Sequence, residues 1–399
     1  MFLGLAQAIV EIYFFFSMKH LVLLGAGRAH LQVLQSLVAL SLPGVHVTLV
    51  TPLPRLVFSE LLSSFVAGHQ PPVNCSISLA PLLDASGTTW LLRSAVTLEV
   101  QSRCLSLDDG SSLTYDVLSI DLPAMLDRQM VEQAMPGARE HALFVRPAET
   151  FFTLWPQVVT LAQKRPLRMT VIGGGRPDVE LALAVVYRLP DSSVTLLTGD
   201  ESAGCGYPPA LQKHVMQALK QHRITVIQER CTGIADGEVT LASGARLACD
   251  VPIIATRADA PTWLRASGLA LDDQGFITVD GFQRVISHRE VFAAGSVSRR
   301  ADMTHLASGT DTSFDVGPAL AKNLRSVLAG IDPTESMYKD KFLDFLSLGE
   351  KRVIANWGNW TAQGYLVWWL KERRDREVLK KYSKYGQSGP AELAGRRAP

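Results

Sequence analysis

Hydrophobic residues are arranged along the chain in two copies of one pattern. Strand-like apolar segments at residues 20–24 and 45–50 flank a stretch in which apolar positions recur at helical spacing. The same order returns around residues 169–172 and 194–197, again with an apolar helical stretch between them. Each copy predicts a β-α-β unit, in which one helix joins two parallel strands.

Glycine-rich turns stand at the same place in both units, directly after the first strand. They are Gly25-Ala26-Gly27 and Gly173-Gly174-Gly175. A strand that ends in such a turn delivers the free N–H groups of the next helix to one point, where a pyrophosphate can lie against the positive end of the helix dipole. One such turn is common in unrelated proteins, whereas two in matching surroundings predict two dinucleotide-binding folds in tandem.

Strand patterns separated by turns continue after each unit. They cover residues 90–101, 103–108 and 113–121 after the first unit and residues 224–229 and 250–255 after the second. The first group predicts a β-meander, so the repeat extends beyond the glycines. Residues 124–166 are expected to be a linker with a helix at 149–164.

The last third of the chain predicts a return to strands and then a small terminal unit. Strands are expected at residues 276–280 and 290–294, and Asp315 and Pro318 mark the start of a helix at 319–328. The remaining chain has the pattern of strand, turn, strand and helix. Its tryptophans and tyrosine lie close together in sequence, at Trp357, Trp360, Tyr365, Trp368 and Trp369.

Composition excludes several classes of function. The 399 residues suffice for two or three domains, and 39 basic against 38 acidic side chains leave no excess charge for nucleic-acid binding. Basic residues concentrate in 371–399, with nine Lys or Arg against four Asp or Glu. No two of the five cysteines form a C-x-x-C pair, which argues against a disulfide framework, a zinc ribbon or any other metal site, and favours a reducing compartment.

Residues 1–17 form an apolar N-terminal extension before the first predicted strand. The segment contains Glu11, lacks a basic start and is short for a membrane span, so it does not have the pattern of a signal peptide. An upstream start, an accessory helix and a weak membrane contact all stay open as explanations.

The order of these elements resembles the two-dinucleotide-binding-domain flavoproteins of the pyridine nucleotide-disulfide oxidoreductase superfamily. The stretches that carry the resemblance are LVLLGAGRAHLQVL, YDVLSID, GGGRPDVELALA and VFAAGS. The chain is most similar to type II NADH:quinone oxidoreductases and to the flavoprotein domain fused to selenide, water dikinase. The resemblance implies an α/β fold with two Rossmann-like domains, the second inserted in the first, and a small C-terminal α+β domain.

The resemblance also implies domain limits and cofactor sites. An FAD-binding domain would cover residues 18–124 and 275–330, an NAD(P)-binding domain 125–274 and a C-terminal domain with a basic, aromatic helix 331–399. The implied FAD-binding residues are Gly25, Gly27, Ala29, His30, Thr51, Arg55, Val96, Gly295 and Ser296. The implied NAD(P)H-binding residues are Gly173, Gly174, Gly175 and Glu180. No catalytic side chain is assigned, because the cofactors carry this chemistry.

Two of these residues have a second interpretation. His30 occupies the third-glycine position of the first turn, where it could touch phosphate or pack between the helix and the meander. Glu180 could lie near the nicotinamide or simply complement the helix dipole.

Several cofactor-facing positions depart from the family pattern. Thr51 and Ser296 replace carboxylates that would hold the ribose and the ribityl chain. The turns Asp121-Leu122-Pro123 and Ala255-Thr256-Arg257 each lose a glycine that lets the backbone approach a cofactor. Asp178 replaces the third glycine of the second turn, where its charge is expected to repel a pyrophosphate. The NAD(P)H site is therefore expected to be more altered than the FAD site.

Two hypotheses about function follow. The first is an FAD-dependent oxidoreductase that passes a hydride from NAD(P)H through the flavin to a quinone or similar acceptor. The alternative is a relative with degenerate cofactor sites that acts as a binding, scaffold or regulatory protein. For the segment 364–384, an interfacial helix at the inner face of the cytoplasmic membrane, a homodimer contact and an ordinary helix of a cytoplasmic protein all stay open.

Overall fold

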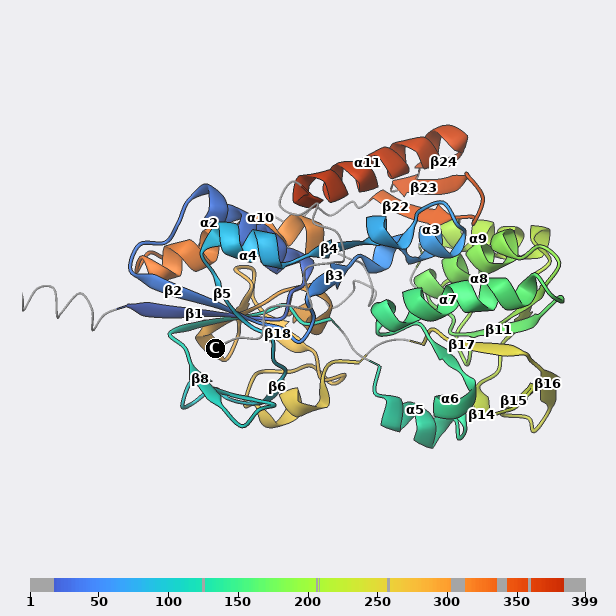
Figure 1. Cartoon of the computed structure of the whole chain (residues 1–399), viewed down its shortest axis with the longest axis horizontal. Helices are drawn as coiled ribbons and strands as arrows, with labels where there is room; N and C mark the ends of the chain where they lie inside the picture. Colours follow the sequence, from blue (N-terminus) through green and yellow to red (C-terminus); the bar gives the residue numbers. More distant parts are fainter. Residues whose placement is uncertain are drawn as a thin grey trace, which may run out of the picture.

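Two α/β units and a small C-terminal unit make up the protein. The computed structural model describes residues 18–123, 126–205, 207, 209–256, 259–302, 313–335, 343–357 and 360–383. The extension predicted at residues 1–17 and the end of the chain after 383 lie outside these ranges. Figure 1 shows the two α/β units side by side, with the C-terminal strands and helix across one side of them. The predicted α/β class with two Rossmann-like units is confirmed.

The first unit is built on one large sheet. Its strands are β1 (Lys19–Leu24), β2 (Val45–Val50), β5 (Thr89–Leu91), β9 (Val117–Ile120), β18 (Ile277–Val279), β19 (Arg284–Val285), β20 (His288–Ala293) and β21 (Ser298–Arg300), in the order β21-β18-β19-β20-β9-β1-β2-β5. The five strands from β20 to β5 run parallel. Its helices are α2 (Arg28–Ala39), α4 (Ala80–Ser86) and α10 (Ser313–Leu328). Every residue of β9 is buried, as expected for a parallel sheet covered on both faces.

The second unit repeats this arrangement. Its strands are β10 (Leu143–Phe144), β11 (Arg168–Ile172), β12 (Ser193–Leu197), β13 (Thr225–Ile227) and β17 (Val251–Ile254), all parallel in the order β10-β17-β11-β12-β13. Its main helices are α7 (Ala148–Ala162), α8 (Arg176–Arg188) and α9 (Pro209–Gln221). In both units the strand order reverses next to the strand that precedes the glycine turn. Ligands of open α/β sheets bind at this switch point, beyond the carboxyl ends of the strands.

A small antiparallel meander is inserted in each unit, before β9 in the first and before β17 in the second. The first contains β6 (Ala95–Glu99), β7 (Cys104–Leu107) and β8 (Ser112–Thr114), and the second β14 (Cys231–Ala235), β15 (Glu238–Leu241) and β16 (Arg246–Ala248). The single strand predicted at 90–101 was wrong, because the Arg93 N–H bonds to the Leu91 carbonyl and turns the chain out of the large sheet. Two short helices, α5 (Arg128–Ala134) and α6 (Ala138–His141), lie in the predicted linker.

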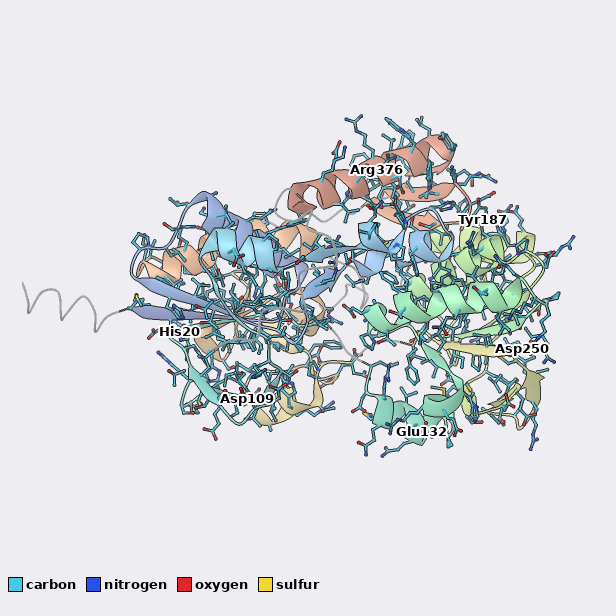
Figure 2. All side chains as sticks on the ribbon, viewed as in Figure 1. His20, Asp109, Glu132, Tyr187, Asp250 and Arg376 are labelled. Carbon is cyan, nitrogen blue, oxygen red and sulfur yellow. The ribbon has the colours of Figure 1, made fainter. Side chains whose placement is uncertain are left out.

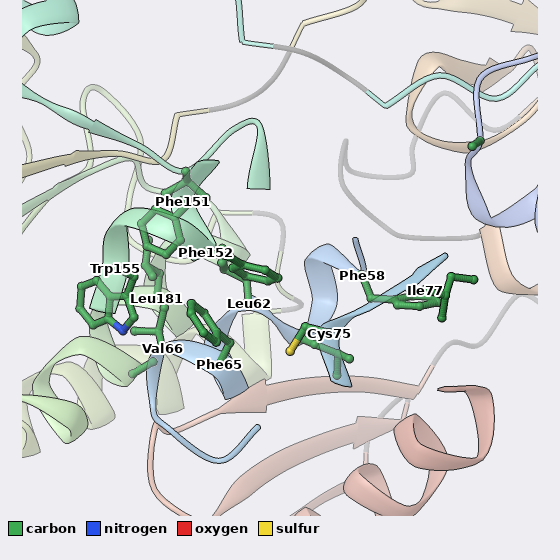
Figure 3. Close-up of a cluster of buried hydrophobic side chains, with 14 of the residues drawn as sticks. Phe58, Leu62, Phe65, Val66, Cys75, Ile77, Phe151, Phe152, Trp155 and Leu181 are labelled. Carbon is green, nitrogen blue, oxygen red and sulfur yellow. The ribbon is translucent and has the colours of Figure 1, made fainter. Parts of the chain in front are cut away.

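An aromatic cluster joins the two α/β units. Between β3 (Arg55–Val57) and β4 (Ser76–Ser78), the first unit extends a turn η1 (Ser59–Leu61), a helix α3 (Leu62–Val66) and a second turn η2 (Pro72–Cys75). Helix α3 packs against α8, and the Phe65 ring lies 4.4 Å from the Phe152 ring of α7. Figure 3 shows Leu62, Phe65 and Val66 next to Phe151, Phe152 and Trp155. This continuous buried cluster holds the two units together.

The described residues of the C-terminal unit form three strands and one helix. They are β22 (Leu343–Ser347), β23 (Val353–Trp357), β24 (Trp360–Gly364) and α11 (Tyr365–Ser383), so the prediction of two strands missed one. Figure 2 shows Arg376 on α11 along the outer edge of the molecule and Tyr187 of α8 below the C-terminal strands. Helix α10 begins at Ser313, so Pro318 lies inside it and does not mark its start.

The segment after residue 259 packs with the first unit. Ala260, Leu264 of the turn η3 (Thr262–Ala266) and Leu269 belong to the same buried cluster as Val22 and Val291 of the large sheet. The sequence had assigned this segment to the NAD(P)-binding domain. We therefore propose that the second domain boundary lies just before residue 260.

Candidate cofactor-binding site

The first glycine turn closes tightly over the end of the large sheet. The Gly25 N–H donates to the Val50 carbonyl at 2.8 Å, and the φ of Gly25 is +91°. A Cβ added to Gly25 would lie 2.4 Å from the Asp121 carbonyl oxygen, so only glycine fits there. Gly27 is the extended N-cap of α2, and its N–H donates to the same Asp121 carbonyl.

The His30 side chain contacts the backbone of this turn. It is fully buried, with Nδ1 2.6 Å from the Gly25 carbonyl and Nε2 2.8 Å from the Ser119 hydroxyl. Burial lowers the pKa of His30 below its ordinary value. Both ring nitrogens have protein partners, so the side chain holds the glycine turn in place.

Acid is expected to weaken the fold through His30. The unfolded chain protonates this imidazole near pH 6.5, whereas the folded protein resists protonation, so the free energy of unfolding falls as the pH drops below 6.5. This group contributes a slope of up to about 1.4 kcal/mol per pH unit. When the free energy of unfolding is measured with urea at pH values from 7 to 5, it should fall less steeply in His30→Gln than in the wild type. An unchanged slope would contradict this assignment.

Some of the remaining FAD candidates lie next to the turn, and the others lie elsewhere in the first unit. Thr51 is buried at the end of β2, next to Val50, and Gly295-Ser296 lies in the turn η4 (Gly295–Val297), where the Ser296 hydroxyl donates to the Leu122 carbonyl at 3.4 Å. Both are therefore brought to the glycine turn. The Arg55 guanidinium instead donates to the Ser76 hydroxyl across the β3–β4 pair, and Val96 is half-exposed in the meander.

The second glycine turn resembles the first, with a positive φ at its first glycine and an extended N-cap at its third residue. The Gly173 N–H donates to the Leu197 carbonyl at 2.8 Å, and Gly175 is the extended N-cap of α8. A Cβ on Gly174 would lie 2.9 Å from the Thr198 carbonyl oxygen. The turn keeps the shape that a pyrophosphate site requires.

Asp178 points inward from this turn. Its carboxylate is buried and accepts a hydrogen bond of 2.8 Å from the Gly175 N–H, which caps the start of α8. Arg146 interacts electrostatically with this carboxylate. The expected repulsion of a pyrophosphate stays a prediction. Arg257, at the altered turn after β17, lies outside the described residues.

Glu180 connects α8 to the C-terminal unit. Its Oε1 accepts hydrogen bonds from the Ser347 N–H of β22 at 3.0 Å and from the Tyr207 hydroxyl at 3.2 Å. Burial raises the pKa of Glu180 above its ordinary value. Glu180 is half-buried, and these two hydrogen bonds join it to β22 and to Tyr207. Its two interpretations from the sequence stay predictions.

Charged side chains lie between the two glycine turns. Arg28, the first residue of α2, donates to Glu60 at 2.5 Å. Arg146, largely enclosed after β10, interacts electrostatically with both Asp178 and Glu60. These charges thus form a series from the start of α2, through Glu60 and Arg146, to Asp178 at the start of α8. Sequence analysis missed Glu60 and Arg146, because charged residues in irregular segments carry no local signal of a shared location.

Asp121 was also missed as a functional residue. It follows β9, and its Oδ2 accepts a hydrogen bond of 3.0 Å from the His30 N–H. A carboxylate directly after a fully buried strand is the signal in the sequence that points to this position.

Comparison with known protein families identifies the family of this chain. The family described as pyridine nucleotide-disulphide oxidoreductase matches residues 19–311. The chain belongs to this family. The predicted superfamily is confirmed, and FAD and NAD(P)H are the cofactors of the family, as the glycine turns predicted. Membership identifies an oxidoreductase and does not favour the alternative of a degenerate scaffold protein.

Relatives within the family are distant in sequence. An NADH dehydrogenase-like protein of Mycobacterium tuberculosis is 25% identical over 248 residues, which are 58% of this chain and 61% of the relative. An oxidoreductase of Pestalotiopsis fici is 26% identical over 220 residues, 53% of this chain and 58% of the relative. The matches thus span about three fifths of the length of these relatives.

Solved structures share the fold over nearly the whole chain. The sulfide:quinone oxidoreductase of Aquifex aeolicus superposes with a TM-score of 0.75 at 17% identity, covering 93% of both chains. NDH2 of Plasmodium falciparum, solved in complex with NADH, gives a TM-score of 0.72 at 14% identity and covers 92% of this chain and 98% of its own. The resemblance to type II NADH dehydrogenases is thereby confirmed at the level of the fold.

The residues of the first turn fit a pyrophosphate in all but one respect. Gly25 and Gly27 provide the turn, and the amide of Ala29 is buried without an acceptor among the described residues. The exception is the Asp121 carboxylate, which lies against Gly27.

Proposed function

We propose that the protein is an FAD-dependent NAD(P)H dehydrogenase that passes electrons to a quinone or a similar acceptor. The observation that carries the proposal is the pair of glycine turns, each at the switch point of a sheet with the same strand order, and linked by the series of charges through Arg28, Glu60 and Arg146. When bound, FAD supplies the acceptor for a hydride from NAD(P)H. The protein provides the geometry and the electrostatics.

The assignment of the binding residues is part of the proposal. Gly25, Gly27 and Ala29 would hold the FAD pyrophosphate, with Thr51 and Ser296 beside them. Gly173, Gly174 and Gly175 would hold the nucleotide of NAD(P)H. Arg55 and Val96 stay on the FAD side as more distant candidates.

The absorption spectrum of the purified protein tests this function. We expect visible flavin bands and, after denaturation, release of one FAD per chain. Colourless protein that does not take up added FAD would contradict the proposal.

The C-terminal unit offers a surface for a lipid-dissolved acceptor. Trp360 is 80% exposed, and the exposed apolar side chains of the described part of this unit are Leu343, Trp357, Trp360, Tyr365, Leu366, Trp369 and Leu370. Basic residues of α11 follow them, with Arg373 over the Trp369 ring at 5.7 Å. Within the described parts of the chain, no helix has the length and apolar character needed to cross a bilayer. Aromatic and basic side chains together suit the interface of an anionic membrane.

Removing two exposed side chains of this unit is expected to weaken vesicle binding. Because burial of each large apolar side chain contributes about 1.5–3 kcal/mol, Trp360→Ser with Leu366→Ser should lower partition into anionic liposomes by at least about tenfold. Met216→Ser, at a half-exposed position of α9, is the matched control and should float like the wild type. Wild-type protein that stays entirely in the soluble fraction would contradict the membrane part of the proposal.

A further inference from the structure

A carboxylate of the chain lies where a cofactor pyrophosphate would approach. A Cβ added to Gly27 would lie only 2.1 Å from Cγ and Oδ1 of Asp121. In Rossmann folds the second glycine of the turn is the position at which the backbone comes closest to the pyrophosphate. Asp121 is 2% exposed, and it accepts the His30 N–H. One N–H group at the start of α2, where a phosphate would bind, therefore already donates to a carboxylate of the protein.

The internal repeat has no acidic residue at the position that corresponds to Asp121, and the carboxylate at its helix terminus comes from Asp178 instead. The Asp121 N–H donates to the Leu24 carbonyl, and the Ala255 N–H donates to the Ile172 carbonyl, both at 2.9 Å. Asp121 and Ala255 are therefore equivalent positions of the two units. The second unit has no carboxylate there, and its helix is capped by Asp178 from within the first turn of α8.

A pyrophosphate bound at the first turn would add a second anion beside the Asp121 carboxylate. A pyrophosphate and an ionised carboxylate at one helix terminus repel each other, most strongly where water is excluded. Arg28 is the cation at the start of α2, and it already forms an ion pair with Glu60. A bound pyrophosphate would share the helix dipole with Asp121.

We propose that Asp121 limits the affinity of the first turn for FAD. Its carboxylate has to turn away from Gly27 before the pyrophosphate can reach the backbone, so FAD exchanges with free cofactor. The inference rests on FAD binding as part of the proposed function. Asp121 acts as a tethered competitor of the pyrophosphate.

Substitution of Asp121 by the residue of the second repeat tests the inference. Asp121→Ala should bind FAD at least about tenfold more tightly than the wild type, measured by quenching of FAD fluorescence on titration with protein. Asp121→Asn keeps the volume and an oxygen for the His30 N–H, so a smaller gain is expected. Asp178→Asn should leave FAD affinity unchanged. ADP, which carries a pyrophosphate, should show the same gain, whereas adenosine should show none.

The outcomes separate this inference from the proposed function. If the wild type binds FAD and neither variant at Asp121 binds it more tightly, the inference is overturned while the function stands. An equal gain for adenosine also overturns it. If Asp121→Ala does not fold, Asp121→Asn decides by the same titration. If no form of the protein binds FAD, both fail.

Discussion

Replacement of Gly25 by alanine is expected to abolish FAD binding and to destabilise the fold by about 2–5 kcal/mol. The left-handed φ of +91° costs a residue with a Cβ about 1–2 kcal/mol. Displacing the Asp121 backbone from the new Cβ costs a further 1–3 kcal/mol or so. Urea unfolding and FAD fluorescence titration measure the two effects.

Gly110 provides the matched control for Gly25. Its φ is +83°, but nothing lies within 4 Å of a Cβ added there, in the hairpin between β7 and β8. Gly110→Ala should therefore lose only about 1–2 kcal/mol and keep FAD binding. If Gly25→Ala and Gly110→Ala lose the same stability and bind FAD equally well, the tight contact of the first turn with Asp121 has no role.

Removal of the Glu180 carboxylate is expected to loosen the C-terminal unit without affecting NADH binding. Glu180→Ala leaves the Ser347 amide without its acceptor, at a cost of about 1–3 kcal/mol in the free energy of unfolding. Glu180→Gln keeps an oxygen acceptor and removes a half-buried charge, so its unfolding free energy should stay close to that of the wild type at neutral pH. Limited proteolysis near β22 measures how far the C-terminal unit is loosened, and titration with NADH measures the affinity for the nucleotide.

A different result would support the interpretation that the family resemblance implies, in which Glu180 lies near the nicotinamide. If Glu180→Gln lowers NADH affinity while Glu180→Ala leaves the stability unchanged, the carboxylate faces the nucleotide and not β22. The two interpretations therefore differ in which variant has an effect and in which measurement shows it.

Local features of the sequence were sufficient to predict the two units and their turns. The strands β1 and β11 are short apolar runs, and each ends at a glycine that adopts a positive φ, Gly25 at +91° and Gly173 at +149°. Such features depend on neighbouring residues only, and their repetition identified the tandem arrangement.

The side chains that complete the site could not be predicted, because their partners are distant in the chain. Asp121 reaches His30 across 91 positions, and Glu180 reaches Ser347 across 167. Each of these contacts depends on which strands lie side by side and on how the C-terminal unit packs. The splitting of residues 90–101 into β5 and β6 has the same origin, since a turn at Arg93 leaves the hydrophobic pattern unbroken.

Anaerobic titration of the FAD-loaded protein with NADH or NADPH tests the central claim most directly. We predict that the visible flavin bands bleach as one equivalent of reduced nucleotide is added and return when a soluble quinone follows. Flavin bands that stay unchanged with both nucleotides, in protein shown to contain FAD, would contradict the assignment as an NAD(P)H dehydrogenase.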